Sequence, residues 1–154
     1  MVLKTGVRLP SPPPIFMRLY NVYGKLQNKN VSRQLVKWDG KSRSNIQFQV
    51  KQFLKNYWLS HVVYEEFPVY GTKMKVDLIN ATLKVAVEVN GKQHSEFNKF
   101  FHSNSRMKYL DSIKRDFKKA EWLEQNKFKL IEIEENEISK LSKEFFKEKF
   151  GLIL

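Results

Sequence analysis

The sequence of 154 residues contains no cysteine. Disulfide bonds and thiolate metal sites are therefore excluded, and a zinc finger with them. Any metal must be held by carboxylates, histidines and water, which are the ligands of hard divalent cations. The composition thus points to a hard divalent cation if the protein uses a metal cofactor.

Long apolar runs are missing as well. No stretch approaches the roughly 18 apolar residues of a membrane span, and the N-terminus lacks the charged, apolar and small-residue order of a signal peptide. The length suits one domain, and 42% hydrophobic residues provide its core. We expect a soluble, cytoplasmic protein with no membrane partner.

Acidic residues are scarce, with 16 Asp and Glu against 28 Lys and Arg, which gives a net charge of +12. A polyanion gains affinity when basic side chains replace its condensed counterions, so this charge favours a nucleic-acid partner. Attraction to a membrane surface, or mere solubility, would also account for the charge and stays an alternative.

The basic residues are concentrated at the start of the chain, where residues 1–44 carry nine Lys and Arg against one acid. We predict that residues 1–41 form a basic extension that contacts nucleic acid and that residues 42–154 form the main domain. The expected contacts are Arg18, Lys25, Arg33, Lys37, Lys41 and Arg43. The interleaved aromatic residues could stack on bases or belong to a small hairpin, and the pattern leaves both readings open.

Hydrophobic periodicity predicts an α/β fold. The apolar spacing indicates a hairpin or extended stretch over residues 23–38 and a helix from Ser42 or Ser44 to Trp58. Three strands over residues 61–69, 73–79 and 82–90 are joined by short turns and should form an antiparallel meander. A helix over 106–125 then leads to a strand over 128–134, parallel to the third strand, and to a last helix over 136–149.

In the long helix, the predicted buried positions are Tyr109, Ile113, Phe117, Ala120 and Leu123. The turn signals of the N-terminal hairpin are Gly24 and the segment 28–30.

Two carboxylates occupy apolar surroundings on neighbouring predicted strands. Asp77 lies late in the second strand, and Glu88 lies near the end of the third. Burying both is costly unless a positive group neutralises them, which a divalent cation would do. The alternative is that both side chains face solvent or pair with lysines such as Lys75 and Lys84.

The segment after Glu88 brings further functional groups to the same place. Gly91 allows a sharp turn directly after the strand, and the turn delivers Lys92, Gln93 and His94 to the strand end beside the carboxylates. The sequence therefore predicts a cluster of metal ligands with an acid or base nearby.

A resemblance to a known superfamily rests on Val76, Asp77 and Leu78 and on the run of residues 87–94, Val-Glu-Val-Asn-Gly-Lys-Gln-His. These segments resemble the central motif of the PD-(D/E)XK nucleases, and more narrowly the branch that holds the very-short-patch-repair endonuclease and the phage homing endonucleases with an EDxHD signature. The resemblance covers roughly residues 42–135. It implies the restriction-endonuclease-like core: helix, three-stranded meander, helix and parallel strand, in a mixed central sheet flanked by helices.

The resemblance also assigns site residues. The branch's aspartate corresponds to Asp77, its variable central position to Glu88, its histidine to His94 and its last aspartate to Asp116. The first acid of the branch falls on Gln47, which carries no charge.

A second departure concerns the lysine that follows the central acid by two residues in the wider superfamily. That position is Asn90 here, and either Lys92 or His94 would have to supply its function.

The resemblance implies a Mg²⁺- or Mn²⁺-dependent endonuclease that hydrolyses phosphodiester bonds in double-stranded DNA. Asp77 and Glu88 would hold the metal, and His94 would act as general base or orient water. Asp116 would orient His94 or contact the metal shell, and Lys92, Gln93 and Arg115 would contact phosphate.

A phage homing endonuclease is the specific expectation, in the cytoplasm of a bacterial or phage-infected cell, and double-strand cutting would require a homodimer. The alternatives are a catalytically inactive nucleic-acid-binding module, a junction-resolving or transposition-type nuclease, or a ribonuclease on the same core.

Overall fold

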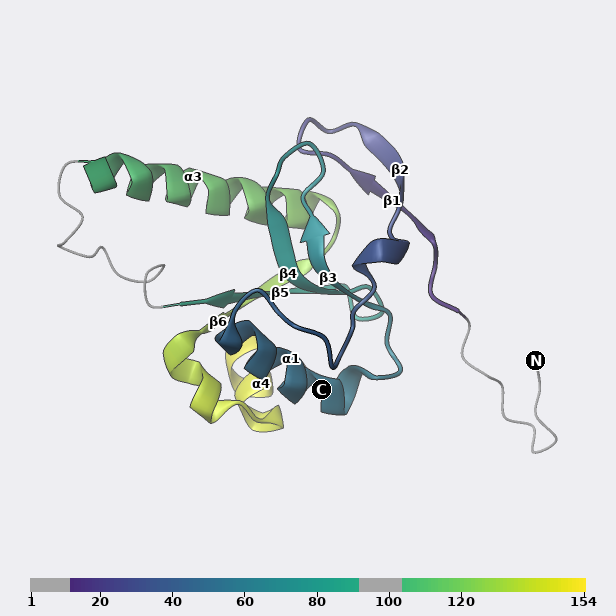
Figure 1. Cartoon of the computed structure of the whole chain (residues 1–154), viewed down its shortest axis with the longest axis vertical. Helices are drawn as coiled ribbons and strands as arrows, with labels where there is room; N and C mark the ends of the chain where they lie inside the picture. Colours follow the sequence, from purple (N-terminus) through teal and green to yellow (C-terminus); the bar gives the residue numbers. More distant parts are fainter. Residues whose placement is uncertain (1–11, 92–103) are drawn as a thin grey trace.

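The protein is a mixed α/β structure built on one four-stranded sheet, seen in a computed structural model that describes residues 12–91 and 104–154 (Figure 1). The strand order is β3-β4-β5-β6. The strands are β3 (Val63–Pro68), β4 (Lys75–Asn80), β5 (Val85–Asn90) and β6 (Lys129–Glu134). The first three pair antiparallel, and β5 pairs parallel with β6, so the predicted meander and parallel fourth strand are confirmed.

Helices α1 (Asn45–Trp58) and α4 (Lys143–Phe150) cover one face of the sheet (Figure 1). Ser44 caps α1 as predicted, because its hydroxyl accepts a hydrogen bond from the backbone N–H of Gln47. Val50, Leu54 and Trp58 follow at helical spacing and are fully buried. They pack with Phe146 of α4 and with residues of β3 to β6, and we call this group the Trp58 cluster.

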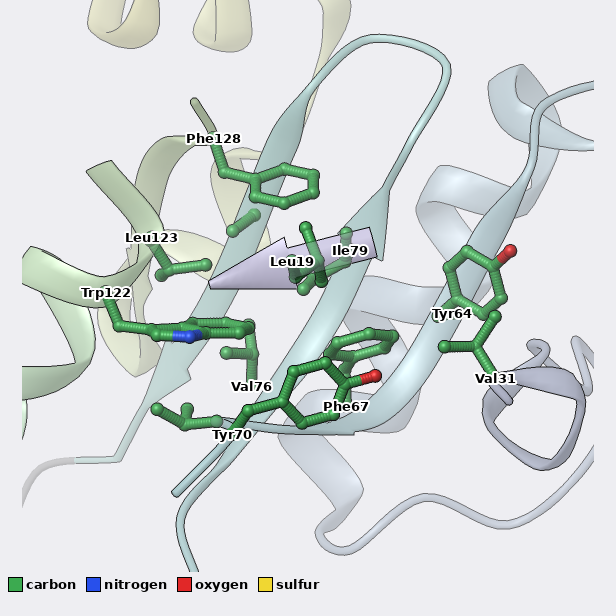
Figure 2. Close-up of a cluster of buried hydrophobic side chains, with 12 residues drawn as sticks. Leu19, Val31, Tyr64, Phe67, Tyr70, Val76, Ile79, Trp122, Leu123 and Phe128 are labelled. Carbon is green, nitrogen blue, oxygen red and sulfur yellow. The ribbon is translucent and has the colours of Figure 1, made fainter. Parts of the chain in front are cut away.

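The opposite face of the sheet is covered by the N-terminal hairpin and by the end of α3 (Asn104–Gln125). The hairpin consists of β1 (Phe16–Tyr20) and β2 (Leu26–Asn30), so the predicted bounds of residues 23–38 are wrong. Figure 2 shows Leu19, Trp122 and Leu123 beside Phe67 and Val76 of the sheet. We call this group the Trp122 cluster.

Hydrogen bonds fasten the hairpin to the end of α3. The carbonyl of Tyr20 accepts from Trp122 Nε1 at 2.6 Å and from Asn126 Nδ2 at 3.1 Å, and Asn126 Oδ1 accepts from the N–H of Tyr20 at 2.8 Å. The hairpin therefore shares its core with the sheet, while the division at residue 41 stays a prediction about nucleic-acid contact.

The turn of this hairpin lies at residues 21–25, with Gly24 at φ 80°. Asn21 Oδ1 accepts from the backbone N–H groups of Tyr23 and Lys25 at 2.9 and 3.0 Å and so closes the turn. The second expected turn, at residues 28–30, is wrong because Asn28 to Asn30 pair with β1 as part of β2. A short 3₁₀ helix, Ser32–Gln34, follows.

Helix α3 buries less than its apolar pattern predicts. Its last turns insert Trp122 and Leu123 into the core, but Ile113 and Phe117 are 47% and 70% exposed and Tyr109 is also exposed. Figure 1 shows the helix running away from the sheet toward its N-terminal end. The predicted burial of these three positions is therefore wrong, while that of Leu123 is confirmed.

The predicted C-terminal helix over 136–149 is divided in two. A 3₁₀ segment, η2 (Glu135–Lys140), comes first, and Leu141 is extended at ψ 122° before α4 begins. The hydroxyl of Ser142 accepts from the N–H of Phe145 and so caps the start of α4. The sequence had predicted one continuous helix through this position. Within the described part of the chain, no helix is long and apolar enough to cross a membrane.

Candidate active site

The site begins where the strand alternation of β3 and β4 breaks. Tyr64 and Phe67 both belong to the Trp122 cluster, three residues apart, although side chains of a regular strand share a face at even spacing. Glu66 lies between them at φ 48°, a backbone conformation that side-chain-bearing residues rarely adopt. The register pairs Glu65 with Leu78 and then Phe67 with Val76. Glu66 and Asp77 lie between these two pairs, opposite each other, and are not themselves paired.

The pairing of β4 with β5 ends beside the same point, at Leu78 and Val87. Beyond this last pair, two backbone N–H groups of β4 and β5 donate hydrogen bonds to carboxylates instead of to the neighbouring strand. The N–H of Asp77 donates to Glu88 Oε1 at 3.3 Å, and the N–H of Val89 donates to Asp77 Oδ2 at 2.8 Å. Asp77 is 1% and Glu88 8% exposed, which excludes the alternative that both carboxylates face solvent.

Among the described residues, each carboxylate has one basic partner at ion-pair distance. Arg43 Nη2 lies 3.4 Å from Asp77 Oδ1, and its side chain is 63% exposed. Lys119 Nζ lies 3.2 Å from both Oε1 and Oε2 of Glu88, and its side chain is 15% exposed. These partners are not Lys75 and Lys84, the neighbours considered from sequence.

Lys119 is the main residue that sequence reasoning missed. Asn90, at the position of the superfamily lysine, donates to Glu134 Oε1 at 3.2 Å instead. An ammonium reaches the central acid from α3 rather than from β5. The available signal was its position three residues after Asp116, because helical residues three apart share a face.

The positive partners do not compensate the burial of the two acids. Burial, with the nearby charge of Asp77, raises the pKa of Glu88 from 4.5 to about 7, although Lys119 acts in the opposite direction. Burial also raises the pKa of Asp77, and the N–H of Val89 and the charge of Arg43 oppose that rise. The positive charges of the described residues are therefore too few to offset the burial of this pair.

Gln47 and Glu66 extend the site toward the first turn of α1. Gln47 is 2% exposed, and its Nε2 donates to Glu66 Oε1 at 2.8 Å. Within the described residues its Oε1 is buried without a hydrogen-bond partner. A buried amide oxygen in this state is costly, and a cation or a water molecule bound there would satisfy it.

A cleft of about 650 Å³ opens over Glu66 and Glu88, bounded by α3 and by the connection between β3 and β4. Among its lining residues, the basic ones are Arg43, Lys73, Lys75, Arg115, Lys118 and Lys119. The acids are Glu66, Glu88 and Asp116. The cleft therefore combines a carboxylate floor with predominantly basic walls, which suits an anionic ligand.

The structure brings together part of the predicted site. Asp77 and Glu88 are in mutual contact, Arg43, Arg115 and Asp116 line the cleft, and Gln47 joins the site through Glu66, which the sequence had not indicated. Lys92, Gln93 and His94 lie outside the described residues.

The remaining predicted nucleic-acid contacts are all exposed: Arg18, Lys25, Arg33, Lys37 and Lys41. As far as the described residues go, none of these five lines the cleft.

The donor atoms present fit a hard divalent cation. Among residues 12–91 and 104–154, no group of three or more His, Asp or Glu side chains is arranged to hold a metal. Two buried carboxylates and one unpartnered amide oxygen are available. Mg²⁺ keeps several waters and commonly takes only one or two protein carboxylates, so Asp77 and Glu88 would be its protein ligands here.

Comparison with known proteins gives one partial similarity. No family model matches the chain, and no solved structure matches it. A segment of 52 residues is 42% identical to "Uncharacterized protein 033L" of Invertebrate iridescent virus 3, and it covers 31% of this chain. The match spans 27% of the length of that viral protein.

Proposed function

We propose that the protein is a metal-dependent DNA endonuclease with a PD-(D/E)XK core. The observation that carries the proposal is the buried pair Asp77 and Glu88, which lies where β4 and β5 separate, with Lys119 on Glu88. The helix, meander, helix and parallel-strand order supports it, as does the basic cleft above the pair. A hydrolase for an anionic diester needs these elements at one point: cation ligands, positive charge and open access.

Asp77 and Glu88 would hold Mg²⁺ or Mn²⁺, which when bound lowers the pKa of a water molecule and polarises the phosphoryl group. Lys119 is held beside Glu88 and would place its ammonium against a non-bridging oxygen of the scissile phosphate, where negative charge grows. Arg43 is largely exposed beyond its contact with Asp77 and would bind the neighbouring phosphate.

His94 keeps its proposed part as general base or water-orienting residue, with Lys92 and Gln93 as phosphate contacts. Asp116 lines the cleft one helical turn from Lys119 and would orient either His94 or the ammonium. In this scheme Gln47 holds Glu66 by its amide N–H and directs its oxygen to a bound water or cation.

Double-stranded DNA is the proposed substrate, and a phage-type homing endonuclease acting in the cytoplasm of an infected cell is the specific form we propose. A homodimer would be needed to cut both strands, because a single Asp77–Glu88 site would act on one strand at a time. The uncharged Gln47 and the engagement of Asn90 with Glu134 favour a second candidate, a binding module without nuclease activity. That candidate predicts salt-sensitive DNA binding with no metal-dependent cleavage.

Incubation of the purified chain with supercoiled plasmid, linear duplex, single-stranded DNA and RNA, with and without Mn²⁺, tests the proposal. Glu88→Gln should abolish metal-dependent DNA cleavage. Glu132→Gln is the matched control, because Glu132 is the register partner of Glu88 on β6 and is exposed. Cleavage of every DNA by Glu88→Gln at the wild-type rate would contradict the proposal, and preferential cleavage of RNA would reassign the substrate.

A further inference from the structure

We infer that an unpaired DNA strand crosses the cleft between α3 and the β3–β4 connection and that Tyr23 stacks on one of its bases. This inference rests on the proposed function and specifies its substrate as DNA with unpaired nucleotides beside the cut. It also moves the main DNA contact from the basic N-terminal residues to the cleft walls.

The walls carry positive charge that the described part of the chain does not neutralise. Lys73 and Lys75 stand on the β3–β4 side, and Arg115 and Lys118 stand on α3. All four are exposed, and within the described residues no carboxylate lies at ion-pair distance from any of them. By contrast, Lys55 is paired with Asp39. Unpaired cations on two facing walls are suited to successive phosphates of one strand.

The cationic surface continues along α3. A second hollow on this helix is lined by Lys108, Asp111, Lys114, Arg115 and Lys118, and so shares two residues with the cleft. The helix extends beyond the sheet at this end (Figure 1). A strand leaving the cleft would therefore meet further positive charge on α3.

Tyr23 lies at the opposite end of this surface, on the tip of the β1–β2 hairpin. Its side chain is 77% exposed, and the ammonium of Lys118 lies 5.9 Å from the centre of its ring. A Cβ atom added at Gly71 would come within 3.3 Å of Tyr23 Cε2, which places the ring edge against the β3–β4 turn. Three elements thus converge at the ring, and two of them form the walls of the cleft.

The backbone holds this ring in place. The N–H of Tyr23 donates to Asn21 Oδ1, and the hairpin is fastened to α3 through Tyr20, Trp122 and Asn126. An exposed aromatic side chain on a fastened hairpin, beside unpaired cations, is a stacking platform for a base. Bases inside a duplex are stacked on both faces, so away from the duplex ends only an unpaired nucleotide offers a free face to Tyr23.

Fluorescence anisotropy in EDTA measures this binding without cleavage. The probes are a labelled blunt duplex and the same duplex with a single-stranded extension, each titrated with the full chain over a range of salt concentrations. The wild type should prefer the extended duplex. Tyr23→Ala should reduce the affinity for it by about tenfold with little change for the blunt duplex, since stacking contributes about 1–3 kcal/mol per base. Tyr20→Ala is the matched control and should leave the preference intact.

Two charge-neutralised variants locate the phosphate contacts. The first variant replaces four cleft-wall residues by Gln: Lys73, Lys75, Arg115 and Lys118. The second replaces four N-terminal residues by Gln: Arg18, Lys25, Arg33 and Lys37. The first should lower the slope of log K against log salt by about 3 to 4, and the second by less than half as much. An equal or larger loss in the second variant, or an unchanged preference in Tyr23→Ala, would overturn the inference.

The outcomes separate this inference from the proposed function. If wild-type protein cleaves DNA but the cleft-wall variant binds normally, the inference alone fails. If the wall variant and Tyr23→Ala lose binding as expected but no substrate is cleaved with Mn²⁺, the nuclease proposal fails and the binding surface stands.

Discussion

Replacing Glu88 by Gln should make the metal-free protein more stable at neutral and alkaline pH. Gln keeps the size of Glu, and its oxygen can still accept from the N–H of Asp77 and from Lys119. It removes a negative charge that is buried beside Asp77. The substitution therefore removes an electrostatic destabilisation that the carboxylate pair causes in the folded wild type.

The magnitude follows from the pKa of Glu88, which rises from 4.5 to about 7 on folding. Because the folded pKa is the higher one, the folded state binds more protons between these values, and stability falls as pH rises through them. The difference corresponds to at most about 3 kcal/mol of lost stability above pH 7. Glu88→Gln also removes the negative charge that Lys119 contacts, which reduces the gain in stability. We therefore expect Glu88→Gln to raise the free energy of unfolding by about 1–3 kcal/mol.

Urea unfolding in EDTA at pH 8 and pH 4 measures the effect. The midpoint of Glu88→Gln should exceed that of the wild type at pH 8, and the two should converge toward pH 4, where the wild-type carboxyl is largely protonated in both states. Mn²⁺ should stabilise the wild type and not the variant at neutral pH. A variant that is less stable than the wild type at pH 8 would refute the electrostatic account of the site.

Two further predictions concern the scaffold. Lys51 is 1% exposed, and its ammonium donates to the carbonyl of Gly40 at 2.8 Å and lies 3.4 Å from Glu65. Lys51→Met should therefore lower the free energy of unfolding, measured in urea, by about 3–5 kcal/mol. A loss below about 1 kcal/mol would contradict this role of Lys51. On α3, Phe117→Ser should change the unfolding free energy by less than about 0.5 kcal/mol, whereas Leu123→Ala should cost about 2–5 kcal/mol. Equal losses in these two variants would show that the exposed part of α3 is packed in solution.

The order of strands and helices was predictable because each element carries its own hydrophobic period. In β5, Val85, Val87 and Val89 alternate with Glu88, and the structure places the valines in the Trp58 cluster and Glu88 against α3. Ser44 likewise carries a local signal for the start of α1.

One error arose where tertiary packing decides, and another arose where a local cap divides a helix. Phe117 continues an apolar stripe, but the sheet supports only the last turns of α3, so the stripe is exposed. In the C-terminal segment, the hydroxyl of Ser142 competed with helix continuation and started a new helix.

The site was predictable only in part for the same reason. Asp77 and Glu88 have local apolar neighbours that mark them, whereas Lys119 reaches Glu88 from 31 residues away in sequence. Glu66 belongs to the site because the backbone turns to positive φ there, and no residue type in the segment signals that change. Long-range partners and backbone irregularities leave no periodic trace in a single sequence.

The most direct test of the account measures metal binding and DNA cleavage in the same samples. Bound Mn²⁺ is counted by its paramagnetic resonance signal, and nicking of supercoiled plasmid is followed in parallel, for wild type and Asp77→Asn. The account predicts that Mn²⁺ binding and nicking are both present in the wild type and both lost in the variant. Nicking that persists in Asp77→Asn would contradict this assignment of the site. Wild-type protein that binds DNA, fails to bind Mn²⁺ and does not cleave would contradict it as well.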